Sequence, residues 1–204
     1  MTKRRLEKPI TSVVVNTTGF SGILNNEYYN QLNCDSIKIV NNRIIFHSTI
    51  TSYTIEKLFE FIKIIIESSN FDRNLNRIYL HIISNGGTLE GLNEFINIKK
   101  IHFTSLEFVS VIEKSCSDAG FMLASLCNYR IIKKNVVCYM SSLDINSKNW
   151  GVYEQGVNIS ELFQYVMLNI KFKVSKDKMS KYITQNNIWN AKKMVKIGFM
   201  DEII

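Results

Sequence analysis

Two short stretches of the chain combine residue types that could serve acyl-transfer chemistry. The first is the turn Ser-Asn-Gly-Gly at 84–87, and the second is the segment 115–120, in which Ser117 precedes a helix-like run. Glycines let a backbone approach a ligand closely, and a serine beside backbone N–H donors can act as a nucleophile at an oxyanion hole. A tight turn and a serine that only caps a helix are the other interpretation.

Both stretches follow segments that the sequence predicts to be strands of one sheet. The run 78–83 is almost continuously apolar, as expected of a buried parallel strand, and 106–112 is a second apolar strand. Between them, 88–99 carries apolar residues at helical spacing. This order predicts a βαβ crossover and a mainly parallel sheet. The Gly-Gly turn and Ser117 are therefore expected at the same side of the sheet, where the two strands end.

The other predicted elements complete an α/β fold. Further strands are predicted at 37–46 with a turn at Asn41-Asn42, and at 129–132, 136–140 and 199–204. Further helices are predicted at 56–67 with an N-cap in 51–54, and at 119–127, 159–173, 175–183 and 191–197. Residues 1–36 are predicted to form an N-terminal arm, and residues 37–204 to form one α/β domain.

Composition narrows the class of protein. The chain has 204 residues, a net charge of +7 and a hydrophobic share of 46%, which fits a folded globular domain. Its lysines and arginines are spread along the sequence, so the charge indicates an acidic partner or compositional drift and supports nucleic-acid binding only weakly. No apolar stretch reaches the length of a membrane span, and the N-terminus lacks the apolar segment of a secretory signal.

The four cysteines predict neither a disulfide framework nor a metal site. Cys34, Cys116, Cys127 and Cys138 form no CxxC pair, and no histidine lies at a spacing suited to zinc. Three of them lie in apolar runs, where a free cysteine behaves as a small hydrophobic residue. We therefore expect an intracellular, reducing location, and we expect no metal or other cofactor.

Four segments, in a defined order, carry a family resemblance. Arg-Ile-Ile-Phe at 43–46 is similar to the first core strand of the ClpP family, the serine-peptidase rings of the Clp protease within the ClpP/crotonase superfamily. The turn at 84–87 is similar to that family's Ser-Pro-Gly-Gly turn, with asparagine in the proline position. The segments 116–123 and 189–203 resemble its nucleophile segment and its closing segment.

The resemblance runs from about residue 42 to the C-terminus, and it implies a fold and one half of an active site. The fold would be a repeated β-α-β superhelix with a mainly parallel sheet and a protruding handle helix at about 144–175. Ser117 takes the nucleophile position, and the N–H groups of Gly87 and Asp118 take the positions of the oxyanion hole. The separation between Gly87 and Ser117 (117 − 87 = 30) is close to that of the family.

The other half of the site departs from the family. Ser141 takes the position of the triad histidine, and a shift of the alignment gives Tyr139 or Ser142 instead. Asn186 takes the position of the triad aspartate. A serine hydroxyl is a poor nucleophile unless a base removes its proton. We therefore expect a divergent, ClpR-like member whose site is catalytically degenerate.

An active enzyme remains the alternative. It would be a serine endopeptidase that uses Ser117 with an unconventional base. All three histidines, His47, His81 and His102, precede Ser117 in the sequence, and none falls at the base position. His81 is more typical of a core histidine than of a relocated base, and Lys114, close to Ser117, is more typical of a solvated lysine.

The resemblance also implies partners. Subunits without triad residues assemble in this family into mixed rings beside active subunits, and two seven-membered rings stack through their handles. We expect a structural subunit in the proteolytic core of an ATP-dependent Clp protease, with homologous ClpP-type subunits, an AAA+ unfoldase and polypeptide substrates as partners, and neither nucleic acid nor a membrane. The cytoplasm or a plastid-type stroma would suit it. A crotonase-like acyl-CoA binder shares the fold, but the handle-like helix and the Ser117 segment argue against it.

Overall fold

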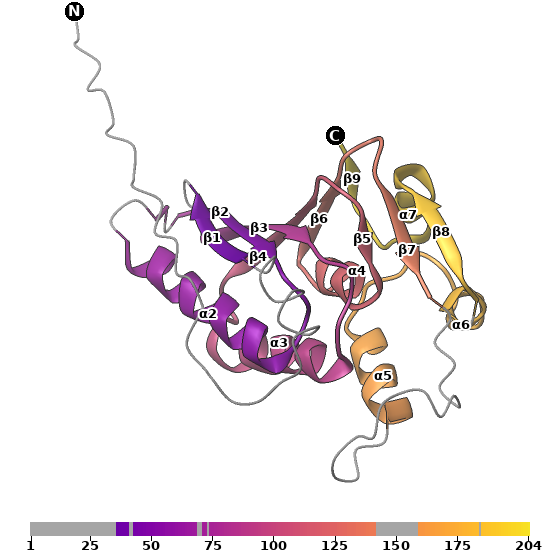
Figure 1. The fold of residues 1–204 in the computed structure, drawn as a ribbon, viewed down its shortest axis with the longest axis horizontal. Coiled ribbons are helices and arrows are strands. Elements are labelled where there is room, and N and C mark those ends of the chain that lie inside the picture. Colours follow the sequence, from indigo (N-terminus) through magenta and orange to yellow (C-terminus); the bar gives the residue numbers. More distant parts are fainter. Residues whose placement is uncertain (1–35, 41–42, 69–70, 73, 142–158, 184) are drawn as a thin grey trace, which may run out of the picture.

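The central element of the fold is a six-stranded sheet of mainly parallel strands. A computed structural model describes residues 36–40, 43–68, 71–72, 74–141, 159–183 and 185–204. The sheet has the order β1-β2-β3-β4-β6-β9, in which β1 and β2 are antiparallel and all other pairs are parallel (Figure 1). Its strands are β1 (Ser36–Val40), β2 (Arg43–His47), β3 (Arg77–Ile83), β4 (Glu107–Ile112), β6 (Tyr129–Ile132) and β9 (Glu202–Ile203).

A smaller sheet lies beside the first and carries the nucleophile segment. It has the order β5-β7-β8, and its strands are β5 (Cys116–Ser117), β7 (Val137–Met140) and β8 (Asn187–Asn190). The sequence prediction missed β5 and β8, because β5 has only two residues and β8 is asparagine-rich, which is atypical of strands. Both strands form because they pair with β7.

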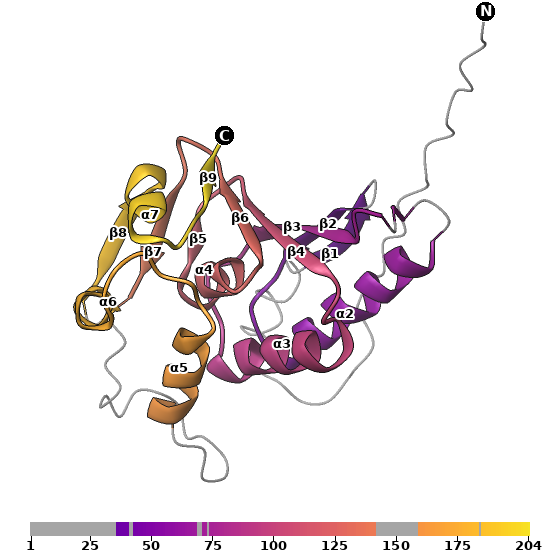
Figure 2. The ribbon, with the colours of Figure 1, turned by 180° about the vertical axis from the view of Figure 1, so that it is seen from behind.

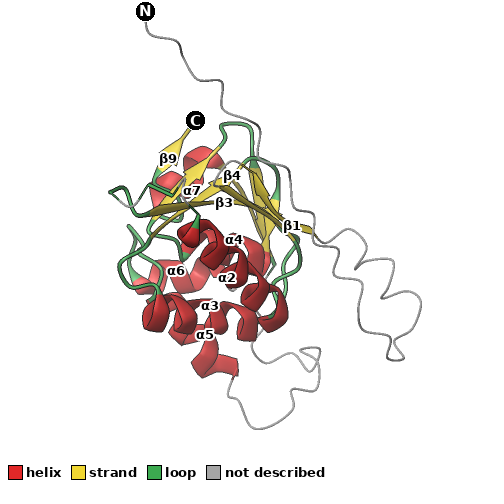
Figure 3. Ribbon diagram, turned by 90° about the vertical axis from the view of Figure 1, so that its left-hand side faces the viewer, coloured by secondary structure: helices red, strands yellow, loops and turns green. Residues whose placement is uncertain are grey.

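Helices cover one side of the six-stranded sheet. Figure 3 shows α2, α3 and α5 together below it, and Figure 2 shows the fold of Figure 1 from behind. The helices are α2 (Ser52–Glu67), α3 (Leu89–His102), α4 (Asp118–Ser125), α5 (Ile159–Leu168), α6 (Lys176–Ile183) and α7 (Ala191–Ile197). Within the described ranges, no helix combines the length and the apolarity needed to cross a membrane.

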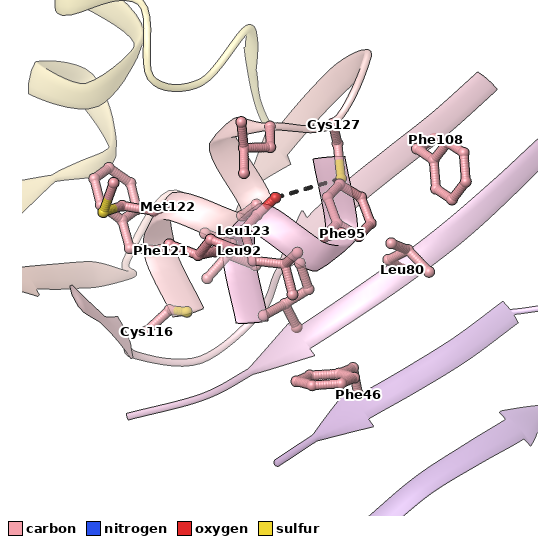
Figure 4. Close-up of a cluster of buried hydrophobic side chains, with 14 of the residues drawn as sticks. Phe46, Leu80, Leu92, Phe95, Phe108, Cys116, Phe121, Met122, Leu123 and Cys127 are labelled. Atoms are coloured by element: carbon pink, nitrogen blue, oxygen red, sulfur yellow. Dashed lines mark hydrogen bonds between the residues drawn. The ribbon is translucent and has the colours of Figure 1, made fainter. Parts of the chain in front are cut away.

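The core lies between the large sheet and these helices. Figure 4 shows side chains from strands and helices meeting there, among them Phe46, Leu80 and Phe95. The Phe95 ring packs edge-on against Phe108, with 5.7 Å between the ring centroids. Helix α4 is buried along residues 119–125, because its small and apolar residues present no polar face.

Several helix boundaries differ from those expected. Helix α2 begins at Ser52, after the N-cap Thr51, instead of at residue 56, and the expected helix 159–173 ends at Leu168. Asn169 ends that helix, because its side chain donates to the Tyr165 carbonyl oxygen (2.6 Å) and its N–H turns to the Val166 oxygen. Most of the expected arm (1–35) and the first part of the expected handle (144–158) lie outside the described residues, as does Cys34.

The closing segment is attached to the sheet by a buried arginine. Arg130 of β6 is only 4% exposed. Its Nε and Nη2 donate to the two carboxylate oxygens of Asp201, both at 2.8 Å, and its Nη1 donates to the Gly198 carbonyl oxygen (2.8 Å). Burial alone would raise the pKa of Asp201, but the hydrogen bonds and the charge of Arg130 outweigh it and lower that pKa.

Candidate active site

The Gly-Gly turn follows β3 directly and is held in a glycine-only conformation. Gly86 and Gly87 have φ values of 127° and 149°, which other residues rarely adopt. The Ser84 hydroxyl stabilises the turn by two hydrogen bonds. It accepts one from the Gly86 N–H (3.3 Å) and donates one to the Gly86 carbonyl oxygen (3.2 Å). A side chain at Gly87 would overlap the Ile50 backbone. The glycines are therefore required by both conformation and close approach.

The N–H group of Gly87 points away from Ile50. Ile50 donates to the Gly86 carbonyl oxygen (2.9 Å) and accepts from the Thr88 N–H (2.8 Å), which forms an isolated parallel bridge centred on Gly87. In such a bridge the central residue directs its N–H and C=O to the opposite edge. The Gly87 N–H is thus available on the side away from Ile50, as the expected oxyanion-hole role requires.

Ser117 lies at the helix start, but its hydroxyl does not cap the helix. It occupies the N-cap position of α4, and its side chain makes no capping hydrogen bond. Its N–H donates to the Ser84 carbonyl oxygen (2.9 Å), which joins the nucleophile segment to the Gly-Gly turn. Gly120 permits this approach, because a Cβ there would lie 2.5 Å from the Ser84 Cβ. The interpretation of Ser117 as only a cap therefore loses its main physical support.

Asp118 has a role that the sequence did not indicate. It adopts a left-handed conformation with φ of 46°, which aspartate tolerates better than most residues. Its Oδ1 accepts hydrogen bonds from both the N–H and the hydroxyl of Ser141, each at 2.7 Å. A Cβ built on Gly86 would lie 3.7 Å from Asp118 Oδ2. The carboxylate therefore lies beside the Gly-Gly turn and is bonded to the residue in the histidine position.

The register of the small sheet determines which residues lie beside Ser117. Ser117 pairs with Tyr139, and Tyr139 pairs with Ile188, so these three share one face of the sheet. Ser141 follows two residues after Tyr139 on that face. The last antiparallel pair, Met140↔Asn187, lies directly beside Ser141 and Asn186 in the sequence. The structure joins Ser141 to Asp118, and no signal in the sequence indicated that bond.

The opposite face of the small sheet is closed and holds two thiols. Cys116, Cys138 and Trp189 are register partners there, and all three are buried. Cys116, Cys127 and Cys138 are free. Burial raises the pKa of the Cys138 thiol to about 12 and that of Cys116 further, so neither provides a thiolate nucleophile at neutral pH.

The candidate bases outside the triad positions, His81 and Lys114, are not bonded to Ser117 in the described part of the chain. His81 Nδ1 lies 3.5 Å from Glu113 Oε1, and burial lowers the pKa of His81 although Glu113 acts in the opposite direction. Lys114 lines a cavity together with Lys133. Among the described residues, no hydrogen bond joins a histidine or a lysine to Ser117, and no group of three His, Cys, Asp or Glu side chains is arranged to hold a metal ion.

Two features of this arrangement bear on acyl transfer, the glycine turn and the Asp118 carboxylate beside it. An oxyanion hole works because N–H dipoles meet a developing negative charge. A carboxylate within about 4 Å of that point would oppose the charge, since two like charges at that separation repel by about 4 kcal/mol at an effective dielectric constant of about 20. The site thus combines a serine hydroxyl that makes no capping hydrogen bond and a glycine turn with a carboxylate beside that turn.

Comparisons with known proteins support the fold. No protein-family model matches the sequence, and no curated protein matches it either. Solved structures do match. One is described as the crystal structure of a peptidase from Plasmodium falciparum, with 19% sequence identity and a TM-score of 0.57. The match covers 80% of this chain and 95% of that one. The chain therefore has the α/β fold of a solved peptidase, with a mainly parallel sheet.

Proposed function

We propose that the chain is a ClpP-like subunit of the proteolytic core of an ATP-dependent Clp protease, with a degenerate site and a structural role in a mixed ring. The observation that carries this proposal is the pair of hydrogen bonds from Ser141 to the Asp118 carboxylate. They occupy the position where the resemblance requires a histidine base, and they put a negative charge beside the expected oxyanion hole.

Several features support the structural part of this role. The sheet, the Gly-Gly turn and the buried helix α4 are intact, while Ser141 and Asn186 replace the ionisable members of a triad. A scaffold needs its apolar faces but not its charged catalytic groups. In this proposal homologous ClpP-type subunits complete heptameric rings, α5 belongs to the handle through which two rings stack, and an AAA+ unfoldase delivers polypeptides. The free cysteines suit a reducing compartment, either a cytoplasm or a plastid-type stroma.

One observation favours the alternative of an active serine endopeptidase. The Ser117 hydroxyl forms no capping bond, and its strand partner Tyr139 is exposed on the same face. A nucleophile needs such a free hydroxyl. A base would still have to come from a group that is not bonded to Ser117 in this structure.

Measurements of intact-complex mass and of probe labelling distinguish a structural subunit from an active serine endopeptidase. The chain would be expressed alone and together with a catalytically active, homologous ClpP-type subunit. We expect rings only with the partner, no labelling of Ser117 by a fluorophosphonate, and unchanged peptidase activity of the mixed ring after Ser117→Ala. The matched control is the nucleophile Ser→Ala change in the active partner, which should abolish activity. A homomeric ring that cleaves a fluorogenic peptide, and that Ser117→Ala inactivates, would establish the alternative.

A further inference from the structure

A lysine-lined cavity lies where β4 and β6 leave the large sheet. Ile112 and Ile132 are register partners at the ends of these strands, so the residues that follow them emerge side by side. The cavity has a volume of about 550 Å³, and Lys114, Lys133 and Lys134 line it together with Glu113 and Val137. Two chain segments that lie nearly twenty residues apart (133 − 114 = 19) thus build one basic site.

The charges in this cavity are not balanced. Glu113 is the only acidic side chain in its lining, against three lysines. Its Oε1 is shared between Lys133 Nζ and His81 Nδ1, each at 3.5 Å. Within the described part of the chain, no ion pair includes Lys114 or Lys134, and both are exposed. The cavity therefore has a net positive charge and two lysines available to an anionic group.

An apolar strip continues from the cavity along the small sheet. Val137 lines the cavity and is 43% exposed. Tyr139 lies two residues further on the same face of β7, and its register partner Ile188 is 72% exposed. Exposed aliphatic and aromatic side chains in a row are typical of a surface that contacts a partner.

We propose that this cavity and the strip from Val137 to Ile188 form a docking site for an extended polypeptide segment with clustered carboxylates and an apolar side chain. The carboxylates would meet Lys114 and Lys134, and the apolar side chain would cover Val137 and Tyr139. Charge complementarity favours an acidic ligand. A nucleic acid fits less well, because backbone recognition uses a long basic track, whereas here three lysines adjoin apolar side chains. The inference does not depend on the proposed function.

Fluorescence anisotropy with the full chain tests the site. The probe is a fluorescein-labelled peptide of alternating glutamate and leucine, and the matched probe has lysine for glutamate. We expect saturable, salt-sensitive binding of the acidic probe only. The double variant Lys114→Glu and Lys134→Glu should weaken it at least about tenfold, because like charges then face each other. Val137→Ser should weaken it about threefold without changing its salt dependence.

A matched control separates the site from net charge. Lys63→Glu with Lys178→Glu makes the same change in total charge on helices α2 and α6, at exposed positions. It should leave binding within about twofold of the native chain. Equal loss in both double variants, or equal binding of both probes, would overturn the proposal. Displacement of the acidic peptide by short DNA at equal charge concentration would assign the surface to nucleic acid instead. Unchanged melting temperatures show that each variant is folded.

Discussion

Asp118 Oδ1 accepts two hydrogen bonds from Ser141, one from its N–H and one from its hydroxyl, both at 2.7 Å. The pair joins the first residue of α4 to the residue that follows β7. A carboxylate acceptor strengthens such bonds roughly twofold relative to neutral ones. The contact thus fixes the nucleophile segment against the small sheet, and it engages Ser141, the residue in the predicted histidine position, in a structural hydrogen bond.

The stability carried by this pair is measurable in a double-mutant cycle. Asp118→Asn keeps an acceptor and tolerates the left-handed backbone but removes the charge, so we expect the free energy of unfolding to fall by about 1 kcal/mol. Ser141→Ala removes one of the two bonds and should have a similar effect. Because both changes weaken the same charge-assisted bond between the Ser141 hydroxyl and Asp118, their combination should cost less than their sum by at least about 0.5 kcal/mol in urea denaturation.

Two exposed residues supply the control cycle. Asp177→Asn and Ser115→Ala lie on α6 and before β5 and are not in contact in this fold. Their effects should be small and additive. Additive costs at Asp118 and Ser141 as well would mean that the hydrogen bonds contribute nothing to stability.

The charge of Asp118 should affect the reaction rate of Ser117 more strongly than it affects the free energy of unfolding. Ser141→His with Asn186→Asp restores triad side chains at the positions that the family resemblance gives to the histidine and the aspartate. We expect this double variant to react with a fluorophosphonate about 10²- to 10³-fold more slowly than the triple variant that also carries Asp118→Met, because the carboxylate opposes the developing anion. Labelling rates followed by intact-protein mass measure this difference.

Asp118→Met alone is the control for that comparison. It removes the carboxylate but supplies no base, so Ser117 should stay unlabelled. If the double and triple variants react equally fast, the carboxylate does not act on the transition state, and only the missing base explains an inactive site.

The large sheet could be predicted from sequence, whereas only the strand β7 of the small sheet could. The strand 129–132 is confirmed to the residue, and those at 78–83 and 106–112 to within one, because continuous apolar runs between glycine, asparagine and charged residues define buried parallel strands. Strand β8 has no such run. It exists because Trp189 and Ile188 pair with β7, a contact between residues some fifty positions apart (189 − 138 = 51).

The candidate site was predictable in position but not in chemistry. The glycines and Ser117 are signalled by their spacing after strands, which the backbone geometry requires. The role of the Asp118 side chain could not be predicted from the sequence. A carboxylate at a helix start is common, and its usual partners are backbone N–H groups of that helix. Only the pairing of β5 with β7 brings Ser141 within its reach.

The pair Arg130–Asp201 should make the stability of the chain depend on acidity. The pKa of Asp201 is lower in the folded state than its ordinary value, so its contribution is complete above about pH 4 and is lost as the pH falls through the lowered pKa. Asp201→Asn leaves a buried arginine without its counter-charge and should cost about 3 kcal/mol at neutral pH. Urea denaturation at several pH values measures both effects.

The neighbouring acid is the control for this prediction. Glu202 accepts only from the exposed Tyr129 hydroxyl, so Glu202→Gln should change the free energy of unfolding by less than about 0.5 kcal/mol at any pH. The difference in the free energy of unfolding between the native chain and Asp201→Asn should become smaller as the pH falls. A difference that stays constant would assign the acid dependence to other carboxyl groups.

Ser117 and Thr51 both occupy helix N-caps, yet only one of them caps. Thr51 accepts from the Thr54 N–H (3.2 Å), and its own N–H donates to the Thr54 hydroxyl (2.9 Å), so Thr51→Ala should lower the free energy of unfolding by about 1 kcal/mol. The Ser117 hydroxyl makes no such bond, so Ser117→Ala should stay within about 0.5 kcal/mol of the native chain. Chemical denaturation of the two variants compares them directly. Equal costs would make Ser117 a structural cap, whereas the expected difference leaves its hydroxyl without a structural reason to be there and strengthens the interpretation of this segment as a former nucleophile.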